Sequence, residues 1–81
     1  MKDIEYSRGA VRTLARMPRH RAISIRNKIR ACAENPSSQA NNVERLRGAD
    51  GLLRLRVGDW RVIMRDAGRV QVLHIASRGG A

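Results

Sequence analysis

Cysteine, aromatic side chains and long apolar runs are all scarce in this sequence. Its one cysteine, Cys32, allows no internal disulfide and fits a reducing compartment such as the cytoplasm. With only two histidines beside it, no metal site of the Cys/His cluster type can form, and no cofactor is expected. No apolar run exceeds three residues. A membrane-spanning helix needs about 20 apolar residues and a signal-peptide core about 7 to 15, so neither is expected.

The low aromatic content limits the ways in which the chain could bind nucleic acid. Tyr6 and Trp60 are its only aromatic residues, which gives little support to binding by base stacking. The hydrophobic fraction of 42% still argues against wholesale disorder. Because 81 residues leave room for one small core, we expect a single domain over residues 1–81.

Positive charge is what the sequence has in excess. Seventeen basic residues against seven acidic ones give a formal net charge of +10. Lys2 and Lys28 are the only lysines, so the other fifteen basic residues are arginines. Guanidinium groups bind phosphate and carboxylate bidentately. The surface should therefore attract a polyanion, either a nucleic acid, an acidic protein or anionic lipid.

The order of periodic segments predicts an α+β domain. Apolar residues at helical spacing fill two segments separated by Pro18, and the period then changes to two in the second half of the chain. The order β-α-α-β-β-β predicts an N-terminal helical hairpin packed on a small twisted antiparallel sheet. The expected elements are a strand over Lys2–Tyr6, helices over Arg8–Met17 and Arg19–Glu34, and strands over Leu53–Val57, Trp60–Arg65 and Val70–Ala76.

Arginines converge on the hairpin predicted around Gly58-Asp59. Arg54 and Arg56 on its first strand should share a face with Arg61 on its second, because cross-strand neighbours lie within about 5 to 8 Å. Arg78 follows the last strand and could reach the same surface. Guanidinium groups packed this closely repel one another, and a bound phosphate backbone would offset that repulsion.

Other interpretations of these charged residues are open. The arginine cluster can also be a solvated face whose guanidinium groups pair with nearby acidic residues, namely Glu44, Asp50 and Asp59. The first predicted helix carries three arginines spaced four residues apart, Arg8, Arg12 and Arg16. This spacing is typical of an exposed face that serves solubility. The alternative is that these arginines attract a polyanion. His74 stands in the last strand and is expected to be half-buried and structural.

A longer motif spans the region from Leu46 to Ile63. It consists of a Leu-x-Gly, a strand ending Arg-x-Arg-x-Gly, an Asp-aromatic-Arg and an aliphatic strand. This motif resembles the central signature of the RelE/ParE toxin superfamily. The opening Ile4–Ser7 and the closing Val72–Arg78 resemble the ends of the same family. The resemblance implies the fold predicted above and the toxin half of a bacterial type II toxin–antitoxin pair.

The family has two branches with different targets. RelE-like members cleave messenger RNA in the ribosomal decoding site, whereas ParE-like members inhibit DNA gyrase. We expect the RelE-like activity, an endoribonuclease that inhibits translation, with gyrase inhibition as the alternative. The resemblance also implies a cognate acidic antitoxin that forms a hetero-oligomer with the toxin, and the net charge of +10 suits such a partner. A basic nucleic-acid-binding domain without toxicity is a third possibility.

The resemblance further implies roles for individual arginines. Arg54 and Arg61 match family positions that contact and stabilise the phosphate, and Arg78 matches the arginine of the family's terminal strand. These three arginines are the expected catalytic residues. Arg56 matches an arginine that binds RNA or antitoxin, and the same role is expected for Arg45 and Arg47.

The residues that would transfer protons during RNA cleavage match the family less well than the arginines do. Leu52 and Arg54 stand where RelE-like members have lysines, and Ser77 stands where many relatives have a histidine. Arginine does not release its proton at neutral pH. Asp59 and His74 are then the remaining candidates for the general base and acid.

Overall fold

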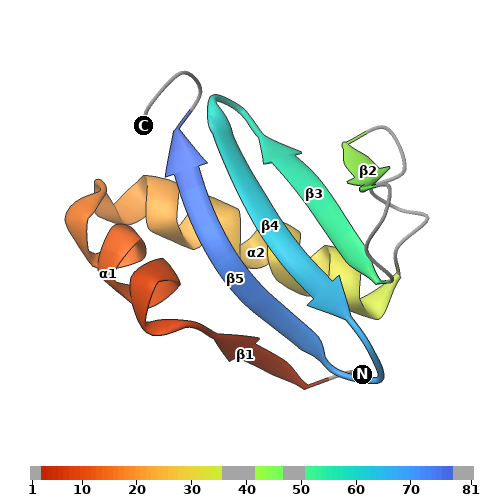
Figure 1. Ribbon diagram of the computed structural model, residues 1–81. Helices are drawn as coiled ribbons and strands as arrows, with labels where there is room; N and C mark the ends of the chain where they lie inside the picture. Colours follow the sequence, from red (N-terminus) through yellow and green to blue (C-terminus); the bar gives the residue numbers. More distant parts are fainter. Residues whose placement is uncertain (1–2, 36–41, 47–50, 78–81) are drawn as a thin grey trace.

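Two helices and five strands make up the residues that the structure, a computed structural model, describes: 3–35, 42–46 and 51–77 (Figure 1). The helices are α1 (Arg8–Arg16) and α2 (Arg19–Glu34), and the strands are β1 (Ile4–Tyr6), β2 (Val43–Arg45), β3 (Leu52–Val57), β4 (Trp60–Asp66) and β5 (Val70–Ser77). Every predicted element is present with closely similar ends, and β2 is an additional strand.

Local signals in the sequence delimit the helices. Ser7 caps α1, because its Oγ accepts a hydrogen bond from the backbone N–H of Ala10 at 3.0 Å. The same hydroxyl donates to the carbonyl of Leu73 at 2.9 Å, which ties the start of α1 to β5. Pro18 stands between the two helices, where it has no intrahelical N–H bond to lose.

The strands form one mixed sheet in the order β1-β5-β4-β3-β2. The four strands from β2 to β5 pair antiparallel, whereas β1 runs parallel to β5. The α+β fold is thus confirmed, and the prediction of a wholly antiparallel sheet is wrong at the β1–β5 pair. The connection from β1 to β5 runs through both helices and the other three strands, and a connection of that length allows a parallel pair, which the sequence period does not reveal.

The short strand β2 forms the edge of the sheet beside β3. In its register Glu44 lies opposite Arg54. The backbone N–H of Arg56 donates to the carbonyl of Asn42 at 2.8 Å, which extends the pairing at the start of the strand. A strand of three residues is too short to show the alternation that predicts longer strands, so β2 was not foreseen.

The hydrophobic core lies between the helices and one face of the sheet. α2 crosses that face behind β4 and β5, and α1 lies beside β5 (Figure 1). The largest fully buried side chains are Ile25, Ile29, Leu55, Val62, Met64 and Val72. In the described part of the chain no helix covers the other face, which we call the outer face. Because side chains alternate along a strand, the residues between the core positions of β3 and β4 point there.

An exposed ion pair joins β1 to the turn before β5. Arg69 Nη1 lies 2.8 Å from Glu5 Oε1. The hydrogen bond with Glu5 and the charge of its carboxylate raise the pKa of Arg69. Since that pKa is already far above neutral, the guanidinium stays charged at physiological pH.

Neither of the helices described above is long and apolar enough to cross a membrane.

Candidate functional site

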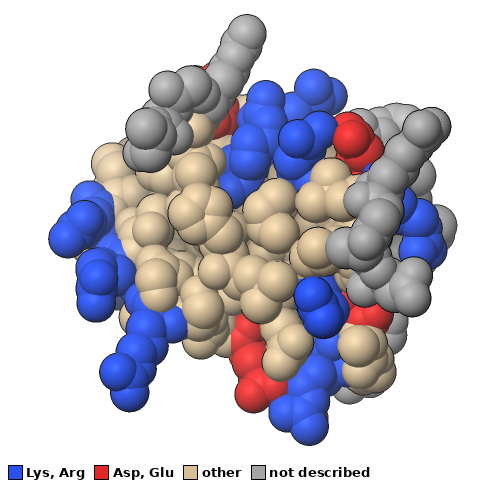
Figure 2. Space-filling model, viewed as in Figure 1, with Lys and Arg blue, Asp and Glu red and all other residues tan. Residues whose placement is uncertain are grey.

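Three of the predicted site arginines lie together on the outer face. The turn falls at Gly58-Asp59, as predicted, and it sets the register of the hairpin. In this register Arg56 is directly opposite Arg61, and Arg54 lies two pairs further from the turn, opposite Ile63 and on the same side of the sheet. Figure 2 shows basic side chains gathered over the end of the outer face where β3 meets β4, above an uncharged centre.

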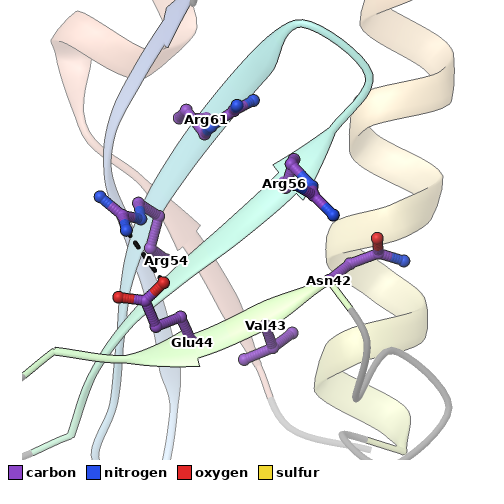
Figure 3. Close-up of a pocket in the computed structure, with 6 residues that line it drawn as sticks. All are labelled: Asn42, Val43, Glu44, Arg54, Arg56 and Arg61. Carbon is purple, nitrogen blue, oxygen red and sulfur yellow. Dashed lines mark hydrogen bonds and ion pairs between the residues drawn. The ribbon is translucent and has the colours of Figure 1, made fainter.

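These arginines and the edge strand β2 surround a concavity of about 430 Å³ (Figure 3). Its lining residues are Asn42, Val43, Glu44, Arg54, Arg56 and Arg61. The volume lies within the range of about 300 to 1,000 Å³ that is usual for ligand pockets. With three guanidinium groups and one carboxylate in its wall, the concavity suits an anionic ligand.

Arg54 is held by an ion pair across the β2–β3 pairing. Its Nη2 lies 2.9 Å from Glu44 Oε2, and Figure 3 shows the two side chains pointing toward each other. Both are substantially exposed, with 43% of the Arg54 side chain and 63% of the Glu44 side chain accessible. The Glu44 pair expected for a solvated face is therefore present. Asp50 lies outside the described residues, and no described residue forms an ion pair with Asp59.

Within the ranges that the structure describes, no carboxylate forms an ion pair with Arg61 or Arg56. Nη1 of Arg61 donates to the backbone carbonyls of Gly58 and Trp60, both at 3.2 Å. These neutral acceptors fix the side chain beside the turn without cancelling its charge. Among the described residues, none forms a hydrogen bond or an ion pair with the Arg56 guanidinium, although its exposed side chain lines the same concavity.

His74 also lies on the outer face, in line with Arg54. It pairs with Ile63 on β4, which in turn pairs with Arg54 on β3. The expectation of a half-buried His74 is wrong, because the residue is exposed. The register shift beside Ile63 leaves Leu73 unpaired, and such a bulge interrupts the alternation of side chains, so that Leu73 and His74 are both exposed.

Of the other predicted site residues, Arg45 is the one that the structure describes, and it does not line this concavity. Arg45 pairs with Leu53, a core residue, so it lies on the opposite side of the sheet edge from Glu44 and Arg54. Arg47 and Arg78 lie outside the described residues, and their roles stay predictions.

The sequence of the whole chain matches a known family. The matching model is described as "ParE toxin of type II toxin-antitoxin system, parDE", and it covers residues 4–81. The chain belongs to this family. It is thus a type II toxin of the RelE/ParE superfamily, as the motif around the β3–β4 hairpin predicted.

Solved structures share the fold of this toxin. A RelE–RelB complex from Pyrococcus horikoshii OT3 matches with a TM-score of 0.82 and 22% identity over 99% of this chain and 98% of that one. The isolated RelE toxin of E. coli matches with a TM-score of 0.80 and 13% identity, over 96% and 85%. A RelB–RelE antitoxin–toxin complex from Methanococcus jannaschii gives 0.72 and 18%, over 93% and 91%. A comparison with curated protein sequences gave no match.

Glu44 lies in the wall of the toxin's concavity, whereas the sequence alone indicates only that it could form an ion pair with the arginines. Its place in the wall depends on β2, and no pattern within the three residues of that strand signals the pairing with β3. Within the described part of the toxin, no three His, Cys, Asp or Glu side chains are grouped so that they could hold a metal ion.

Proposed function

We propose that this toxin acts in the RelE manner, as an endoribonuclease that cleaves messenger RNA on the ribosome in the cytoplasm and so inhibits translation. The observation that supports this proposal is the convergence of Arg54, Arg56 and Arg61 on one concavity of the outer face. Guanidinium groups form short charge-assisted hydrogen bonds with phosphate oxygens. An RNA strand crossing this face would offer them successive phosphates.

The proposed reaction is a transesterification at phosphorus. The 2′-oxygen of one nucleotide forms a bond to the adjacent phosphorus, and the bond from phosphorus to the 5′-oxygen breaks. A base takes the proton of the 2′-hydroxyl, and an acid supplies a proton to the leaving 5′-oxygen. The products are a 2′,3′-cyclic phosphate and a 5′-hydroxyl. Arg54 and Arg61 stabilise the negative charge that develops on the non-bridging oxygens.

Proton transfer needs a group other than arginine. His74 is exposed on the outer face, in line with Arg54, and imidazole exchanges protons near neutral pH. We therefore assign one proton transfer to His74. Asp59, exposed in the β3–β4 turn, is the candidate for the other.

Ribosomes programmed with a defined message test this function. Purified toxin is added, and cuts are mapped by primer extension on the codon in the A site. We expect cleavage within that codon by the wild type and much less by Arg61→Ala. A message that stays intact at stoichiometric toxin contradicts the proposal.

Inhibition of DNA gyrase is the second candidate, because the family model that matches the sequence is that of a ParE toxin. A supercoiling assay with relaxed plasmid separates the two functions. Loss of supercoiling together with an intact message supports the ParE-like activity, whereas unchanged supercoiling removes it.

The partner that we propose in either case is an acidic antitoxin encoded beside this gene. The net charge of +10 favours such a partner, and the solved structures from P. horikoshii and M. jannaschii are complexes with an antitoxin. Expression of the toxin alone should arrest growth, and co-expression of the neighbouring gene should relieve the arrest. Normal growth on expression would instead favour a non-toxic nucleic-acid-binding domain.

A further inference from the structure

The carboxylate of Glu44 already fills one of the anion-binding positions of the concavity. Its Oε2 lies 2.9 Å from Nη2 of Arg54, the distance of a charge-assisted hydrogen bond. A carboxylate offers guanidinium a pair of negative oxygens, as a phosphate does. Within the described residues, Arg54 is the one arginine of the concavity that has an anionic partner.

The backbone holds Glu44 in this position. Residues 43–45 pair with β3, and the bond from the N–H of Arg56 to the carbonyl of Asn42 fixes the start of β2. Rotation of the Glu44 side chain alone can therefore release Arg54, since no bond of the sheet has to break. The carboxylate would swing into solvent, because most of its side chain is already exposed.

The other two arginines make this exchange favourable for a phosphate chain. Arg56 has no partner among the described residues, and Arg61 has only neutral carbonyl acceptors. A phosphate drawn to these two positive charges approaches Arg54 as well, because all three side chains line one concavity. An exposed ion pair contributes little free energy, so an incoming phosphate can displace the carboxylate.

We propose that Glu44 holds the place of a phosphate on Arg54 in the free toxin, and that RNA binds by exchanging one of its phosphates for the Glu44 carboxylate. The identity of the ligand as RNA rests on the proposed function. Glu44 is then a positioning residue: it keeps the Arg54 guanidinium over the concavity and lowers the affinity of the empty site for anions.

A double-mutant cycle tests this exchange through binding rather than cleavage. The affinity for a short, uncleavable 2′-O-methyl RNA is measured by fluorescence anisotropy for the wild type, Glu44→Gln, Arg54→Gln and the double variant. We expect Glu44→Gln to bind the RNA about two- to fivefold more tightly than the wild type, which is the range of an exposed ion pair. In the Arg54→Gln background the same substitution should have almost no effect.

Glu5→Gln is the matched control. Glu5 also forms an exposed ion pair, with Arg69 at 2.8 Å and outside the concavity, so its loss should leave RNA affinity unchanged. Circular dichroism confirms that each variant is folded. The proposal is overturned if Glu44→Gln binds RNA no better than the wild type, or if the gain persists without Arg54. In the second case Glu44 acts only through general charge repulsion.

Inorganic pyrophosphate is a second probe that separates this proposal from the proposed function. Its binding is followed by NMR of the Arg54 side-chain N–H. If no variant binds RNA while Glu44→Gln still binds pyrophosphate more tightly than the wild type, the exchange stands and the RNA function fails. If the wild type and Glu44→Gln also bind pyrophosphate with the same affinity, the proposed exchange is wrong.

Discussion

In the part of the chain that the structure describes, the Arg61 guanidinium donates to two neutral backbone carbonyls, those of Gly58 and Trp60, so no carboxylate offsets its charge there. Arg54 differs, since the carboxylate of Glu44 compensates its charge in the free protein. At the scale of single residues, the site therefore contains one restrained and uncompensated guanidinium that is ready to meet a phosphate. Arg61 is accordingly the residue whose loss should affect cleavage most directly.

Removal of the Arg61 guanidinium is the first prediction. Loss of one preorganised donor to a developing negative charge lowers the rate by about 10² to 10³. We expect this decrease for Arg61→Ala in single-turnover cleavage on programmed ribosomes. Arg65→Ala on the same strand is the control, because Arg65 is exposed outside the concavity and its loss removes equal charge. If Arg61→Ala and Arg65→Ala lower the cleavage rate equally, the catalytic site lies elsewhere.

Two glycines allow a matched test of backbone strain. Gly51 has φ of 76°, and a Cβ there would lie 2.8 Å from the carbonyl oxygen of Asp66. Gly58 has φ of 57°, but among the described residues beyond its two chain neighbours no atom lies within 4 Å of its Cβ position. We expect Gly58→Ala to cost about 1 to 2 kcal/mol through its left-handed backbone alone.

Gly51→Ala should cost more than Gly58→Ala, about 2 to 4 kcal/mol, because the backbone clash adds to the strain. Urea denaturation of both variants gives the two free energies of unfolding. A loss for Gly51→Ala no larger than that for Gly58→Ala would show that the chain relaxes around the new methyl group.

At the scale of secondary-structure elements, the cap at Ser7 connects α1 to the sheet. Its Oγ accepts from the N–H of Ala10 and donates to the carbonyl of Leu73. We expect Ser7→Ala to lower the free energy of unfolding by about 1 to 2 kcal/mol, the usual effect of losing an N-cap. The measurement is the shift of the urea midpoint at constant slope.

Thr13→Ala is the control for the cap. The Thr13 hydroxyl donates to the carbonyl of Gly9 at 3.0 Å within α1 and, as far as the described residues go, forms no hydrogen bond with another element. Because alanine favours helix more than threonine does, this variant should be as stable as the wild type or slightly more so. Equal destabilisation of both variants would mean that any hydroxyl in α1 matters, not the cap.

The elements also show where prediction from sequence succeeds and where it fails. The sequence predicts β3 and β4 with their shared arginine face, because apolar residues at every second position over Leu53–Val57 and Trp60–Met64 have one consistent orientation. β2 escaped prediction because three residues carry no period. The sequence also did not predict the exposure of His74. A bulge adds one residue to β5, and no residue pattern in this apolar strand indicates where the bulge lies.

At the scale of the whole molecule, the net charge of +10 predicts binding that weakens with salt. Three arginines that each neutralise one phosphate of a single strand give a slope of about −2 in a plot of log affinity against log salt concentration. Anisotropy titrations with the uncleavable RNA at several salt concentrations measure this slope.

The same titrations decide between the two interpretations of the exposed arginines on α1. A slope steeper than about −4 would mean that RNA contacts more basic residues than the three of the concavity, and those of α1 are the first to test. In that case Arg12→Ala should reduce the slope. If the helix face serves only solubility, Arg12→Ala leaves the slope unchanged.

The sequence by itself determined the family, the α+β class, both helices and the face shared by Arg54, Arg56 and Arg61, because these follow from local periodicity and from one contiguous motif. Only the tertiary structure decided that β1 lies parallel to β5, that β2 forms an edge and that Glu44 pairs with Arg54. Those features depend on pairing between separate strands, and the periodicity within one strand carries no information about its partner.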